Sequence, residues 1–247
     1  MKHIRMQTPR IAIIGILLAI QFLGAQEKSF HIEDWEKRLN KRQPPVKIMD
    51  AIGVKQGMII GEVGAGTGRM TMWLASRVGD SGKVYANDIN KKSLGQLRER
   101  SKRDEFKNIE IIVGEMEDPK LPAKTLDIAF MINVYHHLDE PVPLIRNILP
   151  SLKSSGVLAI VECDPDKVDW GKEEGCTGKK DMVKELDKAG FKIIRIETFL
   201  NEDNIYIAKP KKEIREKAKE FYQKTLELNP ASKTAKMKLD ELKEKMP

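Results

Sequence analysis

Cysteine is scarce in this chain, with two residues, Cys163 and Cys176, among 247. Two cysteines cannot supply a disulfide scaffold or a cysteine-rich zinc module. Aromatic residues make up only 6% of the sequence, but hydrophobic residues of all kinds reach 40%, which is enough for a sizeable core. A charged fraction of 33% excludes a polytopic membrane protein. We therefore expect a soluble globular protein with one large domain, or one domain with appendages.

Negative charge is missing from the first 25 residues, which carry a net charge of +3. The whole chain carries +7, and residues 209–247 contribute +5 of it. Residues 26–208 therefore hold 29 basic side chains against 30 acidic ones. A nearly neutral central region lacks the basic surface that binding to a phosphate backbone requires, so nucleic acid is not expected as a partner.

The N-terminus has the charge pattern of an export signal. Three cations, Lys2, Arg5 and Arg10, precede the apolar segment 11–23. This segment is short for a membrane span and ends in small residues, so cleavage after Ala25 is favoured over a retained anchor. A buried first strand or helix is the alternative. If the signal is cleaved, the protein is periplasmic or secreted and keeps no stable membrane span. Otherwise it is membrane-anchored or cytoplasmic.

Short apolar runs alternate with helical patterns between residues 58 and 209. The expected strands span 58–63, 83–89, 109–115, 126–133, 156–164, 191–200 and 204–209, and the expected helices span 67–78, 91–104, 141–152 and 179–189. This alternation predicts an α/β fold with a largely parallel sheet covered on both faces. The last two runs are three residues apart, too close for a crossover helix, so they should form an antiparallel hairpin.

Helical segments are expected on both sides of the 58–209 domain. A lead-in over 26–57 contains the helical stretch 34–52, which is broken at Pro44 and Pro45 and should cover the front of the sheet.

The tail, 210–247, is charged and helical. Its Ala218, Tyr222, Thr225 and Pro230 have the spacing of the second helix of a tetratricopeptide repeat. Such repeats need about three copies to bury a continuous core, so an amphipathic helical hairpin is the favoured alternative. These helices could bind a protein partner.

A glycine-rich turn follows the first expected strand of the domain. In MIIGEVGAGTGR, Glu62 precedes Gly64, Gly66 and Gly68 at the start of a helix. Glycines let the backbone approach a ligand closely, and the helix start offers free N–H groups. A nicotinamide-binding loop needs a glycine where Arg69 stands, so a pyrophosphate loop is disfavoured. The acidic Glu62 suits a ligand with a positive charge and an amino group.

Candidate binding residues end the next three strands. Asp88 lies twenty residues after Gly68, where a carboxylate can accept hydrogen bonds from two ribose hydroxyls. A role as a helix cap is the alternative. Glu115 and Met116 end the third strand and suit an adenine amino group and ring face, and Asn133 ends the fourth.

Tyr135, His136 and His137 follow the fourth strand and are the candidate catalytic residues. One histidine could face a substrate pocket as a base or orienting group, and a structural role is equally open for all three. Adjacent residues on a helix point about 100° apart, and no third ligand stands at recognisable spacing, so no metal site is expected.

Cys163 and Cys176 could form a disulfide if the protein is exported. A buried thiol together with a free thiol is the favoured expectation, and the two are not a redox pair.

Five segments resemble, in order, the successive motifs of class I S-adenosylmethionine-dependent methyltransferases. They are EVGAGTG, YANDIN, VGEMEDPKLP, LDIAFMINVYHHLDEP and LKSSGVLAIVE. The resemblance covers roughly residues 35–209 and is closest to bacterial single-domain members of unassigned substrate. It implies a Rossmann-like, doubly wound, mostly parallel sheet of seven strands with an antiparallel last strand. It also implies S-adenosyl-L-methionine as cofactor, with contacts at Glu62, Gly64, Gly66, Asp88, Met116 and Asn133.

In methyl transfer the sulfonium is already an activated electrophile, so the enzyme mainly aligns the acceptor and excludes water. A base helps only when the acceptor must lose a proton. The lead-in and the loop 164–178 are expected to wall the acceptor pocket. Both are short, which favours a small molecule or an exposed protein group as acceptor. The main alternative is a catalytically idle cofactor-binding domain that recruits a protein through its C-terminal helices.

Overall fold

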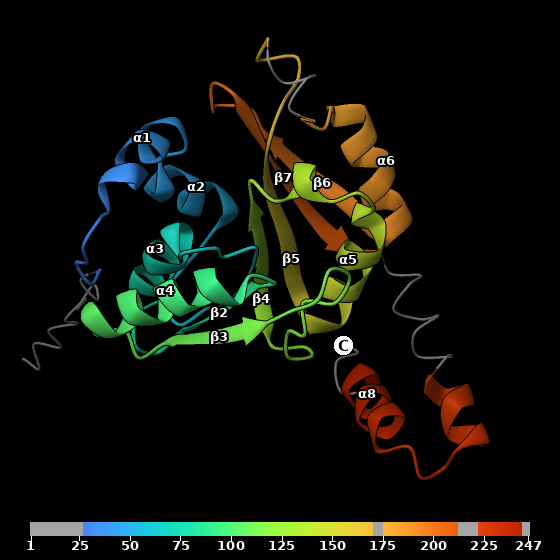
Figure 1. The fold of residues 1–247 in the computed structure, drawn as a ribbon. Coiled ribbons are helices and arrows are strands. Elements are labelled where there is room, and N and C mark those ends of the chain that lie inside the picture. The colour runs from blue at the N-terminus through green and yellow to red at the C-terminus, as the bar shows by residue number, and fades with distance from the viewer. Residues whose placement is uncertain (1–26, 170–174, 212–221, 244–247) are drawn as a thin grey trace, which may run out of the picture.

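The computed structural model describes residues 27–169, 175–211 and 222–243 (Figure 1). The expected signal peptide over 1–25 lies outside these ranges, so its presence stays a prediction. Within the described ranges, no helix is long and apolar enough to cross a bilayer.

Seven strands form one mixed sheet in the order β3-β2-β1-β4-β5-β7-β6. They are β1 (Ile59–Val63), β2 (Lys83–Asp88), β3 (Ile109–Val113), β4 (Leu126–Ile132), β5 (Leu152–Cys163), β6 (Phe191–Glu197) and β7 (Asp203–Pro210). Strands β1 to β5 pair in parallel, whereas β7 runs antiparallel to both β5 and β6. The predicted α/β class, the seven strands and the antiparallel hairpin are confirmed.

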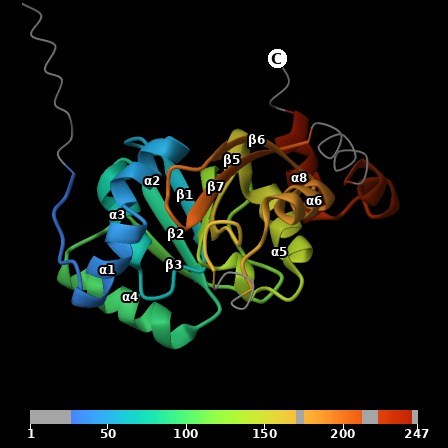
Figure 2. The ribbon, with the colours of Figure 1, turned by 90° about the horizontal axis from the view of Figure 1, so that it is seen from above.

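Helices cover both faces of the sheet (Figures 1 and 2). They are α1 (Asp34–Arg42), α2 (Pro45–Ile52), α3 (Arg69–Val78) and α4 (Lys91–Arg103) on one side, and α5 (Pro141–Ile148) and α6 (Lys179–Ala189) on the other. One buried cluster includes Leu74 and Phe130, and a second includes Ile145 and Leu186. Each face of the sheet therefore has its own core, as a doubly wound fold requires.

The helical lead-in is interrupted at the two prolines, as predicted. Helix α1 ends at Arg42, Pro44 takes an extended conformation, and Pro45 is the first residue of α2. A residue that precedes proline avoids the helical region, and proline fits the first turn of a helix because its missing N–H would have no intrahelical partner there.

One boundary differs from the expectation. The helix expected over 141–152 ends at Ile148 and is followed by a short 3₁₀ turn, because Pro150 cannot donate the hydrogen bond that would continue it. Strand β5 then begins at Leu152 and includes residues 153–155 at an irregularity in its pairing with β4. Because these residues are polar, the hydrophobic pattern did not show the start of the strand.

The described part of the tail is helical, with one helix over 222–228 and α8 (Lys233–Lys243). Ala235 and Leu239 on α8 are buried. Ala218, one of the residues that suggested a tetratricopeptide repeat, lies outside the described residues. The repeat therefore stays a prediction.

Candidate cofactor and acceptor site

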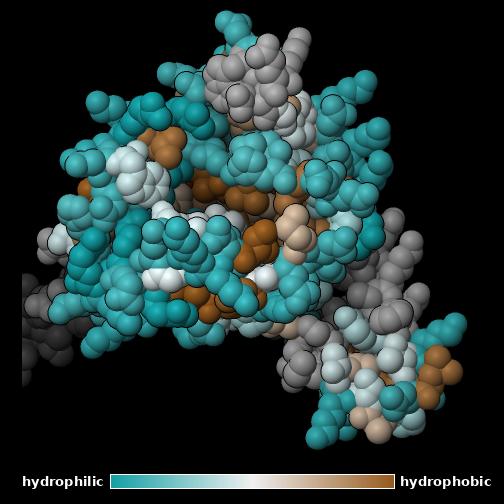
Figure 3. Space-filling model, in the orientation of Figure 1, coloured by the Kyte–Doolittle hydropathy of each residue, from teal (hydrophilic) through white to brown (hydrophobic). Residues whose placement is uncertain are grey.

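The parallel strands bring the candidate residues to one edge of the sheet. The strand order reverses between β1 and β4, and ligands of open α/β sheets bind beyond the carboxyl ends of the strands at such a point. Figure 3 shows a hollow with a hydrophobic floor in this face, between the region of α1 and α2 and the region that follows β4.

The three glycines after β1 have different reasons to be glycine. All have positive φ, 78° at Gly64, 55° at Gly66 and 92° at Gly68. A side chain at Gly64 would overlap Val134, and one at Gly68 would overlap Leu97. The space beside Gly66 is open for at least 4 Å. Packing thus requires Gly64 and Gly68, whereas Gly66 leaves room for a ligand to reach the backbone.

Asp88 ends β2 and holds the glycine loop in place. Its Oδ2 accepts a hydrogen bond from the Gly66 backbone N–H at 2.8 Å, and its Oδ1 accepts one from the Asn90 N–H at 2.8 Å. Asn90 itself caps α4, with its side-chain oxygen accepting from two backbone N–H groups. A carboxylate offers about four lone-pair positions, so Asp88 keeps acceptor capacity for a ligand.

Glu62 lies buried at the entrance of the loop. Its Oε2 accepts a hydrogen bond from the Thr71 hydroxyl at 2.5 Å. Burial raises the pKa of Glu62 to about 7, against the opposing effects of the Thr71 hydrogen bond and the Arg69 charge. A cationic ligand beside this carboxyl would favour its ionised form.

Asn133 is tied to the lead-in. It has a φ of 55°, which asparagine tolerates better than most residues. Its amide pairs reciprocally with that of Gln43, at 2.7 Å and 3.0 Å. Gln43 is fully buried, accepts from Arg69 at 2.8 Å and donates to Asp203 at 3.0 Å. Because Gln43 occupies both ends of the Asn133 amide, a cofactor contact from Asn133 would come through its backbone or a remaining lone pair. Sequence reasoning missed Gln43.

The lead-in is also linked to the glycine loop through Arg100. Arg100 of α4 forms a buried ion pair with Glu36 of α1 at 2.8 Å. The same guanidinium donates to the Thr67 carbonyl within the loop at 2.9 Å. The lead-in therefore covers the glycine loop through a buried charge pair that the sequence pattern did not reveal.

Two large apolar side chains are exposed at neighbouring strand ends. Met116, after β3, is 55% exposed, and Ile89, after β2, is 53% exposed. Glu115, before Met116, is exposed and pairs with Lys120. Exposed apolar side chains at this edge could cover a flat ring, and Ile89 was not singled out from the sequence.

His136 reaches the site from a 3₁₀ turn, Tyr135–His137, that follows β4. Its Nδ1 lies 2.6 Å from Oε1 of Glu162, a fully buried carboxyl near the end of β5. The hydrogen bond to Glu162 raises the pKa of His136. Glu162 was not singled out from the sequence, because β4 and β5 meet only in the folded sheet.

The other two catalytic candidates point elsewhere. The Tyr135 hydroxyl donates to Glu185 of α6 at 2.6 Å, and burial raises the pKa of this buried tyrosine. His137 is exposed, and its ring centre lies 4.1 Å from that of His136. The structure brings His136, and not Tyr135, to the site at the carboxyl ends of the strands.

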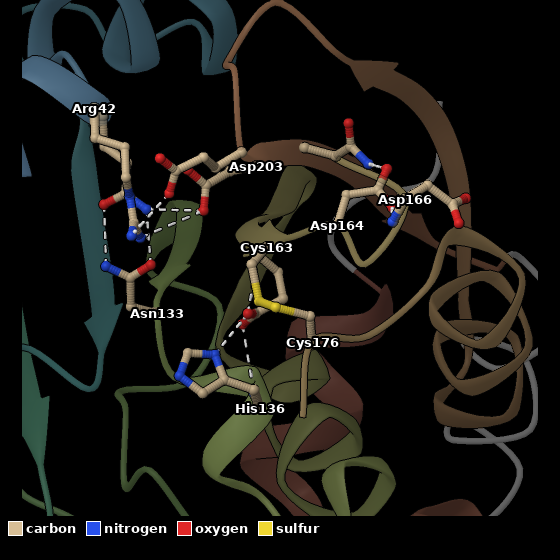
Figure 4. The surroundings of a disulfide bond; sticks show 12 residues. Arg42, Asn133, His136, Cys163, Asp164, Asp166, Cys176 and Asp203 are labelled. Carbon is tan, nitrogen blue, oxygen red and sulfur yellow. Dashed lines mark hydrogen bonds and ion pairs between the residues drawn. A yellow bond between two sulfur atoms is a disulfide. The ribbon is translucent and has the colours of Figure 1, made fainter. Parts of the chain in front are cut away.

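Cys163 and Cys176 form a disulfide, with Cα atoms 5.3 Å apart (Figure 4). The favoured expectation of two thiols was therefore wrong. The loop after β5 starts with a turn in which the Lys167 ammonium donates to the Leu200 and Asp203 carbonyls, both at 2.7 Å. The disulfide joins Cys176 to the end of the strand that the loop leaves, a pairing that cysteine spacing alone does not specify.

This sheet order, with a glycine loop after β1 and an acid ending β2, defines the class I methyltransferase fold. Residues 61–160 match a family model described as a methyltransferase domain. Two curated relatives are the ubiquinone/menaquinone biosynthesis C-methyltransferases UbiE of Escherichia fergusonii and Salmonella arizonae, each 28% identical over 115 residues, 46% of either chain. The chain thus spans about half the length of the curated relatives it matches.

Solved structures agree with this assignment. A SAM dependent methyltransferase from Aquifex aeolicus is 26% identical, with a TM-score of 0.64 over 72% of this chain and 98% of its own. A putative methyltransferase from Bacillus halodurans, 20% identical with a TM-score of 0.55 over 63% of this chain and 71% of its own, supports the fold alone. The chain carries a class I S-adenosylmethionine-dependent methyltransferase domain.

Proposed function

We propose that this protein transfers a methyl group from S-adenosylmethionine to a small acceptor molecule, and that His136 removes the acceptor's proton. The observation that carries the proposal is the contact between His136 and the buried Glu162 carboxyl. Val134, two residues before His136, packs against Gly64 of that loop. The turn that carries His136 therefore starts beside the glycine loop.

The strand-end residues fit the cofactor. Gly66 offers open space where the ligand must approach the backbone, and Asp88 keeps lone pairs for ribose hydroxyls. Glu62 is a buried carboxyl whose pKa of about 7 lets it become charged when a cation binds beside it. When bound, the cofactor supplies an already activated methyl group, so the chain has to position the acceptor and exclude water.

The Glu162 carboxylate determines what the imidazole can do. A carboxylate can only accept, so Nδ1 of His136 carries the proton, and Nε2 keeps its lone pair. The His136 side chain is 19% exposed, whereas Glu162 is fully buried. Nε2 can therefore accept a proton from a bound acceptor, and Glu162 stabilises the imidazolium that forms.

A base of this kind favours an acceptor that must lose a proton during methylation, such as a phenol, an amine or an activated ring carbon. The curated relatives are C-methyltransferases of quinone biosynthesis by name, which is consistent with that class. We propose an acceptor with an ionisable hydroxyl or ring carbon.

The test is purification of residues 26–247, followed by calorimetry with S-adenosylmethionine and a transfer assay with tritiated methyl groups on small-molecule fractions of a cell extract. We expect cofactor binding and label in at least one small-molecule fraction. Binding without transfer to any fraction would favour the catalytically idle alternative. Failure to bind S-adenosylmethionine at millimolar concentration would overturn both.

We also propose that the protein is exported. The proposal rests on the signal-like pattern of residues 1–25 and on the Cys163–Cys176 disulfide. Disulfides persist in oxidising compartments and are rare in the cytosol.

A further inference from the structure

The disulfide lies beside the proposed base, where three side chains of kinds that bind metals come together. His136, Glu162 and Cys163 each offer one ligand atom, and these atoms all lie within 4.8 Å of one another. Figure 4 shows the His136 ring below and to the left of the Cys163–Cys176 disulfide, with a dashed line from the ring to the carboxylate beside it. Imidazole, carboxylate and thiolate together form a ligand set that suits Zn²⁺.

The disulfide makes one of these ligands unavailable. Metals bind the cysteine thiolate, and the sulfur of Cys163 is bonded to that of Cys176. The same bond joins Cys176 to the end of β5, and its cleavage frees the Cys163 thiol. We propose that reduction of Cys163–Cys176 creates a Zn²⁺ site formed by His136, Glu162 and Cys163.

A dithiol can act as the reductant. The dithiol is oxidised to its own disulfide by giving two electrons and two protons, and Cys163 and Cys176 become thiols. Zn²⁺ then displaces the thiol proton of Cys163, which leaves for solvent, and a thiolate–metal bond forms. The Nδ1 proton moves to Nε2 through solvent, and the hydrogen bond at 2.6 Å between Nδ1 and the carboxylate is replaced by one bond from each group to the cation.

Solvent can supply a fourth ligand. Glu162 and Cys163 are buried, but the His136 side chain is partly exposed, so water can complete a tetrahedral arrangement from that side. Bound zinc would oppose the proposed methyl transfer. A cation on Nδ1 leaves the imidazole proton on Nε2, which then cannot accept one from the acceptor.

Cobalt provides a direct test because Co²⁺ bound to thiolate gives a near-ultraviolet charge-transfer absorption. The decisive variant is Cys176→Ser, which keeps all three ligands. It leaves Cys163 without a disulfide partner, so the free thiol is present without any reductant. We expect this absorption in Cys176→Ser, and in the wild type after reduction with a phosphine and its removal under nitrogen. Zn²⁺ should abolish the band by displacement.

Matched controls separate the site from adventitious binding. The oxidised wild type and the double variant Cys163→Ser/Cys176→Ser should show no band. Adding His136→Asn to Cys176→Ser should weaken Co²⁺ binding by at least about tenfold, whereas adding His137→Asn should leave it unchanged. The proposal fails if Cys176→Ser gives no band, or if His136→Asn has no effect. If Cys176→Ser does not fold, the reduced wild type decides, and unfolding on reduction would also overturn the proposal.

Discussion

Asp88 and Gly66 are joined across 22 positions of the chain, with Asp88 Oδ2 accepting the Gly66 backbone N–H at 2.8 Å. The carboxylate that is expected to bind the ribose therefore also fixes the loop that approaches the cofactor. Loss of Asp88 removes both contributions at once. Substitutions at these two positions can separate binding from folding.

Asp88→Ala should weaken S-adenosylmethionine binding by at least about tenfold. Charge-assisted hydrogen bonds are worth roughly 1.5 to 3 kcal/mol, and about 1.4 kcal/mol corresponds to one decade of affinity. Calorimetry measures the change. Asn90→Ala is the control, because it removes the α4 cap and should lower stability by about 1 kcal/mol without a comparable loss of affinity. Unchanged affinity in Asp88→Ala would contradict the assignment.

The glycine loop gives a second prediction. Gly66→Ala adds a methyl group to open space at a φ of 55°, so it should cost the fold only about 1 to 2 kcal/mol. The same methyl group should obstruct the cofactor, and the thermal shift that S-adenosylmethionine produces should shrink or vanish. Gly64→Ala should instead destabilise the unliganded protein more strongly, because its methyl group overlaps Val134. Equal loss of stability in both variants would contradict this distinction.

Glu62 predicts a pH dependence of cofactor binding. Its pKa is raised from 4.5 to about 7 by burial, so the unliganded protein holds it protonated below pH 7. The raised pKa stabilises the fold below pH 4.5, and this stabilisation is lost as the pH rises through 7. The cationic cofactor favours the carboxylate, so affinity should fall by up to about tenfold per pH unit below 7, with proton release.

Calorimetry at pH 6 in two buffers of different ionisation enthalpy measures that proton release. Glu62→Gln should bind more weakly, release no proton and lose this pH dependence. Proton release that persists in Glu62→Gln would assign the effect to another group.

The disulfide and the export proposal can be tested together. Replacing both Cys163 and Cys176 by serine should lower the free energy of unfolding by about 2 to 3 kcal/mol, because the bond closes a loop across 13 positions. In protein from the native cell, alkylation under non-reducing conditions should leave both cysteines unlabelled, and N-terminal sequencing should begin at or near Gln26. An intact Met1 with two alkylated cysteines would place the protein in a reducing compartment.

The sequence predicted the sheet, its hairpin and the glycine loop because each depends on residues that are near one another in the chain. Hydrophobic period, proline position and glycine spacing are local signals. It missed the contacts that strand pairing creates, such as Glu162 beside His136 and Gln43 beside Asn133. A buried glutamate near the end of an apolar strand is the one sign that could have suggested a partner for the histidine.

The pairing of His136 with Glu162 predicts how activity depends on the acceptor. Once an acceptor is found, His136→Asn should lower kcat by about a hundredfold or more, the usual range for a lost general base. Glu162→Gln should lower kcat by less, because it leaves the imidazole in place but weakens the charge that stabilises the imidazolium. KM for S-adenosylmethionine should stay within a few fold in both variants.

His137→Asn, at an exposed neighbouring ring, is the matched control and should retain activity. The decrease in kcat caused by His136→Asn should be smaller for acceptors with a more acidic proton, since they need the base least. A loss that is the same for all acceptors, or equal loss in His137→Asn, would show that His136 only supports the fold of the turn.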